Sequence, residues 1–266
     1  MIGYFKMLLL LTGFCCLGFT SKFDDTCTMR NNAFQADEEV KMKVFYSTLG
    51  MYIGAGEAVF TSKLDRFNGK PVYHLVGEGK TYSTFDNFFK VRDRYESFVD
   101  TANLLPYKFV RNVDEGGYKK YNNVTFNQAA NTAISTNGVF KVTDCVQDVV
   151  SMVYYARNID FSKYKVNDKI PFDMFLDDEV FHLYIRYMGK EKIKTRYGRF
   201  NAIKIKPLLI KGTLFEGGEK MTAWLSDDPN HLLLRVESPI AVGSIKVDMM
   251  SYKNLRHKLT SFIGVR

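Results

Sequence analysis

The sequence is short of the residues from which catalytic and metal sites are usually built. Its four cysteines include no Cys-x-x-Cys spacing and its four histidines lie far apart, so we expect neither a redox site nor a zinc site. It contains no Gly-x-Ser-x-Gly elbow around a serine and no glycine-rich phosphate loop between a strand and a helix. The acidic residues at 177–179 and 227–228 lie at positions where turns favour aspartate. Turn formation explains their presence, so they need not be the catalytic carboxylates of a glycosidase. The sequence therefore predicts a protein that is not an enzyme and that uses no metal and no cofactor.

Long hydrophobic runs are scarce too, and the one that exists lies at the N-terminus. Lys6 precedes an apolar run over 7–17 that is too short to span a bilayer, which predicts a secretory signal over 1–20. A second interpretation makes Cys15 or Cys16 a lipidated cysteine that tethers the protein to a membrane. No later apolar stretch approaches membrane length, so we expect no transmembrane span in the mature chain. The expected location is the periplasm, with the exported protein either free or membrane-tethered.

An arginine-rich arm and an RNA-stacking aromatic motif are missing, although the chain is basic. Its formal net charge is +8, but the basic residues are scattered and the longest interior pairing is Lys119-Lys120. Most of the lysines alternate with apolar residues, as they do on the solvent-facing side of a sheet. We therefore expect no nucleic-acid partner. The excess positive charge would instead suit lipid headgroups or envelope polysaccharide.

If the leader is removed, only two thiols are left, at Cys27 and Cys145. An oxidising periplasm permits a disulfide between them, which would tie the N-terminal segment to the middle of the chain. The alternative is that Cys145 is a small buried hydrophobic residue and Cys27 a free residue of a polar segment. That segment, 21–37, has no apolar pattern and predicts a flexible arm. The remaining residues, 38–266, predict a single antiparallel β domain.

What the sequence has in quantity is the alternation that is typical of β-strands. Over 40–46 valine, methionine and tyrosine alternate with lysine, and Asn68-Gly69 is a strong hairpin signal. Alternation returns in the second half of the chain, for example over 181–187 and 232–237. Many short strands joined by turns predict a mainly β fold, either an antiparallel incomplete barrel or a large curved sheet.

One segment, about 143–157, predicts the main helix. Its valines recur at helical spacing, and Thr143 or Asp144 could cap its start with a side-chain oxygen. Because β-branched valine does not favour an isolated helix, packing must hold this segment in place. We expect the helix to lie against the apolar face of a sheet built half from strands before it and half from strands after it.

A series of motifs runs through the chain in a recognisable order. They are Lys80-x-Tyr, Asp93-x-Tyr-Glu-Ser, Leu105-Pro, Gln147-Asp-Val-Val-Ser, Thr195-Arg-Tyr-Gly and Trp224-Leu-Ser. In this order the chain resembles a family of exported bacterial proteins, the domain of unknown function 3108, common in Bacteroides-type bacteria. The resemblance covers about 38–250, nearly the whole mature chain. The family has no established activity, so the resemblance implies no catalytic residues.

A more distant resemblance concerns the segment 223–237, Ala-Trp-Leu-Ser-Asp-Asp-Pro-Asn-His-Leu-Leu-Leu-Arg-Val-Glu. It is similar to a strand–turn–strand of envelope lipoprotein carriers, in which an unclosed antiparallel barrel wraps a helix-plugged apolar cavity that holds acyl chains. This resemblance implies a half-barrel that binds a lipid. The chain departs from the carriers in having only one firm helix, in mid-chain.

Three functions remain open from the sequence. The first is a non-enzymatic periplasmic protein that holds a lipid or other apolar small molecule in an aromatic cavity lined by Tyr154, Tyr155, Phe215 and Trp224. The alternative for each of these aromatic residues is that its ring packs in the protein core and contacts no ligand. The second is a structural component of the envelope with a filled core, whose basic outer face docks to an envelope protein or an anionic surface. The third is a hydrolase built from residues that are distant in the sequence.

Overall fold

The computed structural model describes residue 27 and residues 29–48, 51–211, 217–240 and 243–265. The expected secretory signal over 1–20 and the candidate lipidation sites Cys15 and Cys16 lie outside the described residues. In the part of the chain that the structure describes, no helix has the length and apolar character to cross a membrane.

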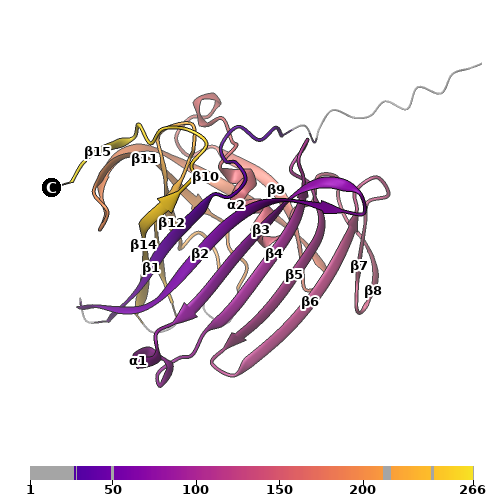
Figure 1. Cartoon of the computed structure of the whole chain (residues 1–266), viewed down its shortest axis with the longest axis horizontal. Coiled ribbons are helices and arrows are strands. Elements are labelled where there is room, and N and C mark those ends of the chain that lie inside the picture. The colour runs from indigo at the N-terminus through magenta and orange to yellow at the C-terminus, as the bar shows by residue number, and fades with distance from the viewer. Residues whose placement is uncertain (1–26, 28, 49–50, 212–216, 241–242, 266) are drawn as a thin grey trace, which may run out of the picture.

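The described chain forms one antiparallel sheet with two short α-helices and one 3₁₀ helix (Figure 1). The strands of the first half are β1 (Glu39–Thr48), β2 (Met51–Phe67), β3 (Lys70–Thr81), β4 (Arg92–Asp100), β5 (Pro106–Glu115), β6 (Tyr118–Asn127), β7 (Thr132–Ser135) and β8 (Gly138–Lys141). Those of the second half are β9 (Lys169–Leu176), β10 (Glu179–Lys194), β11 (Arg199–Pro207), β12 (Thr222–Ser226), β13 (Leu233–Pro239), β14 (Ser244–Lys253) and β15 (Phe262–Gly264). The helices are α1 (Ser83–Asp86), α2 (Val149–Ala156) and η2 (Phe161–Lys163).

The sheet consists of two meanders that meet in its middle. Strands β1 to β8 pair in sequence order, strands β9 to β14 do the same, and β14 pairs with β1 to join the two halves. The order is therefore β8-β7-β6-β5-β4-β3-β2-β1-β14-β13-β12-β11-β10-β9, with β15 added on β11. This confirms the expected mainly β, antiparallel, curved and unclosed sheet with one main helix packed against it.

Local turn chemistry explains why neighbouring strands pair so regularly. At the β2–β3 turn Asn68 and Gly69 have φ values of 50° and 80°, the left-handed backbone that asparagine and glycine adopt most easily. The polar segment 127–138 contains the short strand β7, which pairs with β6 and β8. Its four residues are too few to show an alternation pattern in the sequence.

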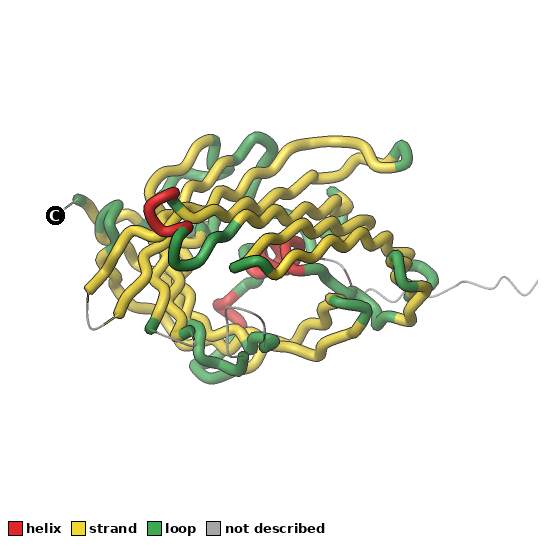
Figure 2. The backbone as a smooth tube through the Cα atoms, turned by 90° about the horizontal axis from the view of Figure 1, so that it is seen from below, coloured by secondary structure: helices red, strands yellow, loops and turns green. Residues whose placement is uncertain are grey.

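The sheet curls around α2, which lies inside the curve with strands on both sides of it (Figure 2). Val150 and Tyr154 pack into a core cluster built mainly on β3 to β7. Met152 and Ala156 pack into a second cluster on β9 to β12. The helix thus fills the space between the two meanders, as its valine pattern predicts.

The helix begins later than the pattern predicts, and its cap is a different residue. Cys145 has a φ of 59°, and Gln147 makes a parallel bridge to Met174 of β9, so the residues before 148 are extended or turned. Asp148 is the N-cap: its Oδ1 accepts hydrogen bonds from the backbone N–H of Val150 and Ser151, each at 2.8 Å. The predicted caps Thr143 and Asp144 are therefore wrong. The residues before Asp148 do not continue the helix, because Gln147 pairs with the edge strand β9 instead.

The gap between the edge strands β8 and β9 is bridged by side chains of the β9–β10 turn. Asp177 forms ion pairs with the guanidinium of Arg111 on β5 and with the ammonium of Lys120 on β6, the latter at 3.1 Å. Asn137, in the β7–β8 turn, donates a hydrogen bond to Asp178 at 2.5 Å. These polar contacts hold the two ends of the sheet together without backbone pairing.

The predicted flexible arm over 21–37 is packed where the structure describes it. Ala33 and Phe34 are fully buried, and the ring of Phe34 lies 4.8 Å from that of Tyr154 on α2. One aromatic residue in a polar segment is enough to anchor it when the core accepts the ring.

Candidate ligand pocket beside the disulfide

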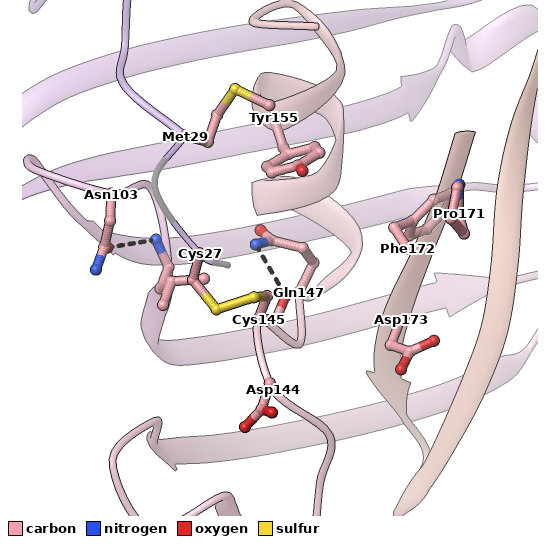
Figure 3. Close-up of a pocket in the computed structure, with 11 residues that line it drawn as sticks. Cys27, Met29, Asn103, Asp144, Cys145, Gln147, Tyr155, Pro171, Phe172 and Asp173 are labelled. Carbon is pink, nitrogen blue, oxygen red and sulfur yellow. Dashed lines mark hydrogen bonds between the residues drawn. A yellow bond between two sulfur atoms is a disulfide. The ribbon is translucent and has the colours of Figure 1, made fainter. Parts of the chain in front are cut away.

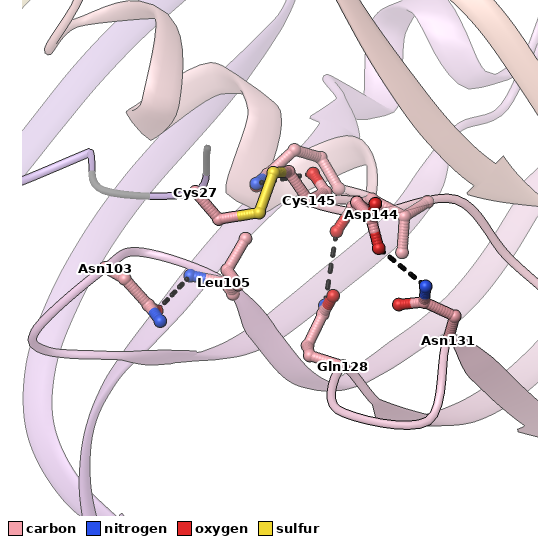
Figure 4. The surroundings of a disulfide bond; sticks show 9 residues. Cys27, Asn103, Leu105, Gln128, Asn131, Asp144 and Cys145 are labelled. Carbon is pink, nitrogen blue, oxygen red and sulfur yellow. Dashed lines mark hydrogen bonds between the residues drawn. A yellow bond between two sulfur atoms is a disulfide. The ribbon is translucent and has the colours of Figure 1, made fainter. Parts of the chain in front are cut away.

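A disulfide joins Cys27 to Cys145 just before α2, with the two Cα atoms 5.4 Å apart. Two side chains of the first half hold the loop that carries Cys145 (Figure 4). Asn131 donates a hydrogen bond to Asp144 at 2.6 Å, and Gln128 donates one to the carbonyl of Val146 at 3.3 Å. Of the two alternatives that the sequence left open, the structure has the disulfide, and it fastens the N-terminal segment beside α2.

A cavity of about 470 Å³ opens beside this disulfide. It lies between α2, the start of β9, the β4–β5 turn and the loop that precedes the helix. In Figure 3 the side chains of Tyr155 and Gln147 stand between the disulfide on one side and Phe172 on the other. Its lining residues are Cys27, Met29, Asn103, Leu105, Asp144, Cys145, Gln147, Tyr155, Pro171, Phe172 and Asp173.

The walls of the cavity are amphipathic rather than wholly apolar. Met29, Leu105, Tyr155 and Phe172 supply thioether, aliphatic and ring surface, while an asparagine, a glutamine and two aspartates supply polar groups. Such a mixture, with a few placed polar groups in an apolar wall, is typical of small-molecule sites.

Gln147 is the polar group of the cavity that the protein leaves incompletely bonded. The residue is only 1% exposed, and its amide nitrogen donates to the carbonyl of Cys145 at 3.3 Å. Its Oε1 accepts no hydrogen bond from any residue that the structure describes. A buried acceptor without a donor is unfavourable, so a ligand that presents a hydroxyl or an N–H here would be stabilised.

Of the three predicted cavity residues that the structure describes, one lines this cavity. It is Tyr155, whereas Tyr154, one residue earlier, is buried in the core against Phe34. Phe215 lies outside the described residues. Successive helical residues point about 100° apart, so two adjacent tyrosines cannot share one wall.

Trp224 lies on the other face of the sheet from α2. Its neighbours Ala223 and Leu225 face the helix cluster, and alternation turns the indole into a third cluster with Phe200 and Leu234. The indole N–H donates to Glu191 at 2.7 Å. Trp224 is therefore a packing residue of the opposite face and does not line this cavity.

Sequence reasoning missed Gln147 and Phe172. The available signal was the pattern Asp148-Val-Val-Ser151, a capping box in which each side chain bonds the other residue's backbone. This box predicts that the helix begins at Asp148 and that Gln147 lies outside it. The place of Phe172 depends on how the edge strand β9 lies against the helix, which no local pattern predicts.

A second polar group lies further along the inner face of the first half. Glu115 and Arg111 of β5 share the face of buried Phe109, and Asp93 of β4 is hydrogen-bonded to Glu115. Burial, together with the charge of Asp93, raises the pKa of Glu115 to about 7. Burial also raises the pKa of Asp93, and that of Tyr95 beside it. Among the described residues no three His, Cys, Asp or Glu side chains gather as metal ligands.

The raised pKa of Glu115 predicts a pH-dependent stability. Between about pH 4.5, the ordinary value, and about pH 7 the folded state keeps a proton that the unfolded state has lost, so stability falls as pH rises. Glu115→Gln keeps the neutral hydrogen-bonding form. We expect its melting temperature to match that of the wild type near pH 5 and to exceed it at pH 8, as calorimetry would measure.

Two comparisons make this test specific. Asp148, whose pKa burial raises to about 6, is present in both proteins and cancels from their difference. Glu179→Gln removes an exposed carboxylate at the start of β10 and serves as the matched control. A Glu115→Gln variant that is less stable than the wild type at pH 8 would contradict the raised pKa of Glu115.

The fold and the cavity together define a class of protein: a curved, unclosed antiparallel sheet wrapped around one helix, with a ligand-sized cavity beside it. The chain belongs to a family described as protein of unknown function (DUF3108), whose model matches residues 41–250. This confirms the family that the motif order resembles. Comparison with curated proteins finds no match.

Comparison with solved structures finds matches of low sequence identity. A β-barrel-like protein of the domain of unknown function DUF1849 from Brucella abortus is 7% identical, with a TM-score of 0.54, and the match covers 84% of this chain and 99% of that chain. A candidate lipoprotein from Parabacteroides distasonis is 10% identical, with a TM-score of 0.36, over 84% of this chain and 100% of that one. A candidate exported protein with a YmcC-like fold from Bacteroides fragilis is 12% identical, with a TM-score of 0.31, over 83% and 97%. The similarity to the Brucella structure concerns the β-barrel-like fold and implies nothing about function.

Proposed function

We propose that this protein is a non-enzymatic binding protein of the periplasm, which holds an amphipathic, lipid-like molecule in the cavity beside the disulfide. The observation that carries the proposal is a cavity lined by Met29, Tyr155, Phe172 and Gln147, beside which the Oε1 of Gln147 is buried without a hydrogen-bond donor. An apolar body would pack against these side chains, and a hydroxyl or amide of the same molecule would donate to Gln147.

The size of the cavity supports a small ligand rather than a macromolecule. Its volume of about 470 Å³ lies within the roughly 300–1,000 Å³ of small-molecule sites. Two carboxylates at the rim, Asp144 and Asp173, are already engaged, the first with Asn131 and the second with His182. The Oδ1 of Asn103 also accepts a hydrogen bond, from the backbone N–H of Leu105 at 3.0 Å. We therefore assign the polar end of the ligand to Gln147.

The test is native mass spectrometry of the protein exported with its own leader, followed by solvent extraction of what co-purifies. We expect a lipid-sized mass on the wild type. Phe172→Asp places a charge in the apolar wall and should reduce the retained fraction at least about tenfold, because an unpaired carboxylate disfavours apolar contact. Gln147→Leu removes the acceptor, together with the hydrogen bond at 3.3 Å that the amide donates to the carbonyl of Cys145. It should weaken retention about fivefold, the worth of one hydrogen bond to the ligand.

The matched control is Phe98→Asp, at a half-buried aromatic residue of β4 that stacks on His74, away from the cavity. It should retain the ligand as the wild type does. A clean unliganded mass for the wild type, or full retention by Phe172→Asp, would contradict the proposal. The spectrum also reports the leader cleavage site and any acyl group on Cys15 or Cys16.

A further inference from the structure

A second and larger cavity lies on the opposite side of the sheet from α2. Its volume is about 680 Å³, and it is bounded by the turn between β10 and β11 and by the faces of β1, β13 and β14. We call it the basic cleft. Its lining residues are Phe45, Tyr52, Lys194, Thr195, Arg196, Tyr197, Gly198, Arg199, Arg235, Lys246, Asp248 and Val265. It shares no residue with the cavity beside the disulfide.

The basic cleft is built by the β10–β11 turn folding onto the second-half strands. The backbone N–H of Arg196 donates to the carboxylate of Asp248 on β14 at 3.3 Å. The guanidinium of Arg235 on β13 donates to the carbonyl of Lys194 at 2.9 Å. Because Asp248 is 1% exposed and Arg235 is bonded to it at 2.6 Å, the turn is fixed to a rigid base.

Positive charge exceeds negative charge in the basic cleft. Five basic side chains line it, against the single carboxylate of Asp248. Arg235 neutralises Asp248, and Lys246 pairs at 3.3 Å with Glu237 beside the cleft. Lys194, Arg196 and Arg199 form no ion pair with any described residue.

Two of these cations lie against aromatic rings that also line the cleft. The guanidinium of Arg196 lies 4.8 Å from the ring centre of Phe45, and the ammonium of Lys246 lies 5.3 Å from that of Tyr52. Such contacts leave the N–H groups of the cation available for an anion. A phosphate group is the anion that a cluster of arginine and lysine recognises best.

The strand end beside the basic cleft exposes large apolar side chains. Met51, Tyr52 and Ile53 at the start of β2 are 60%, 53% and 50% exposed, and Val265 beyond β15 is 71% exposed. Tyr52 and Val265 also line the cleft, so the apolar and basic groups are contiguous. Three consecutive exposed apolar residues are unusual on a soluble surface, where such a patch marks an interaction site.

We propose that the basic cleft and the tip of β2 dock this protein on an anionic membrane surface. The phosphate of a lipid headgroup enters the cleft between Arg196 and Arg199, and Met51, Tyr52 and Ile53 enter the boundary between headgroups and acyl chains. Charge alone would suit any polyanion. The exposed apolar tip favours a bilayer over a nucleic acid, whose phosphate backbone offers no apolar layer.

The test is co-sedimentation with vesicles of phosphatidylcholine, with and without phosphatidylglycerol. The protein carries Cys15→Ser and Cys16→Ser, so that no acyl chain can anchor it. We expect binding only to the anionic vesicles, and loss of that binding at high salt. Lys194→Glu with Arg196→Glu should reduce binding at least about thirtyfold, because each cation near such a surface contributes about fivefold.

Two further pairs of substitutions complete the design. Met51→Ser with Ile53→Ser tests the tip, and should weaken binding to anionic vesicles at least about tenfold through lost apolar contact. Lys63→Glu with Lys141→Glu makes the same change in net charge at exposed sites away from the cleft and should leave binding unchanged. Circular dichroism of each variant verifies that it is folded.

Three results would overturn the membrane assignment. The first is equal binding to neutral and anionic vesicles, and the second is unchanged binding by the Lys194→Glu, Arg196→Glu variant. The third is saturable binding of inorganic phosphate by the wild type without any vesicle binding, which would assign the cleft to a free anion. The proposed ligand cavity stays a separate question, because its mass-spectrometric readout involves neither vesicles nor these residues.

Discussion

Replacing Arg157 by alanine should lower the free energy of unfolding by about 3–5 kcal/mol, because it leaves a buried carboxylate without its partner. Arg157, at the C-terminal end of α2, is 5% exposed and Glu38 is 1% exposed. The two guanidinium nitrogens donate to the two carboxylate oxygens at 2.5 and 3.0 Å. The pair is thus a bidentate ion pair with no solvent to replace either member.

The same guanidinium also holds backbone groups from distant parts of the chain. It donates to the carbonyl of Asn230 at 3.0 Å and to that of Ala33 at 3.2 Å. It lies 5.7 Å from the ring centre of Phe34. One side chain therefore joins α2 to the N-terminal segment, to the start of β1 and to the β12–β13 turn.

Urea unfolding measures this prediction, with Arg66→Ala as the control. Arg66 is exposed near the β2–β3 turn, and its loss should change stability by less than about 0.5 kcal/mol. Arg157→Met combined with Glu38→Leu should recover part of the loss, since it removes both buried charges. A loss below about 1 kcal/mol for Arg157→Ala would refute the structural role given to this pair.

Removing the disulfide should have an effect of similar size. Cys27 and Cys145 are 118 residues apart in sequence, and closing so long a loop stabilises the folded state by up to about 5 kcal/mol in the chain-entropy estimate. We expect Cys27→Ala with Cys145→Ala to lose several kcal/mol in unfolding experiments. This double variant should also release the bound ligand more readily, because the disulfide forms a wall of the cavity.

Reduction supplies the internal control for this second prediction. The wild type in reducing buffer should unfold like the double alanine variant, and the variant itself should be indifferent to the reductant. Equal stability of the oxidised and reduced wild type would show that the core around Phe34 holds the N-terminal segment without the bridge. In that case the ligand experiments with Phe172→Asp would still stand.

Much of the fold follows from local patterns in the sequence. The alternation over 40–46 and 181–187 corresponds to strands β1 and β10, and Asn68-Gly69 makes the β2–β3 turn. These predictions succeed because strand alternation and turn backbone depend on residues that are neighbours in the chain. The valines before 157 predict the helix for the same reason, and only its start was misplaced.

The candidate sites follow much less from the sequence, because each combines residues far apart in the chain. The cavity beside the disulfide joins Met29, Tyr155 and Phe172, and the basic cleft joins Phe45, Arg196 and Lys246. Aromatic character alone singled out Trp224, whose orientation depends on which face of β12 meets α2. Scattered lysines and arginines gave no sign of a cleft, since a turn had to fold over a sheet to gather them.

By itself the sequence determined the kind of element at many points of the chain, and hence an antiparallel sheet with one helix. Side-chain spacing carries that information, because a strand or a helix buries one face whatever its partners are. Only the tertiary structure decided that β14 pairs with β1, that the segment of Phe34 is buried, and where the cavities lie. Those outcomes depend on contacts between residues separated by a hundred positions or more, whose energies no local window contains.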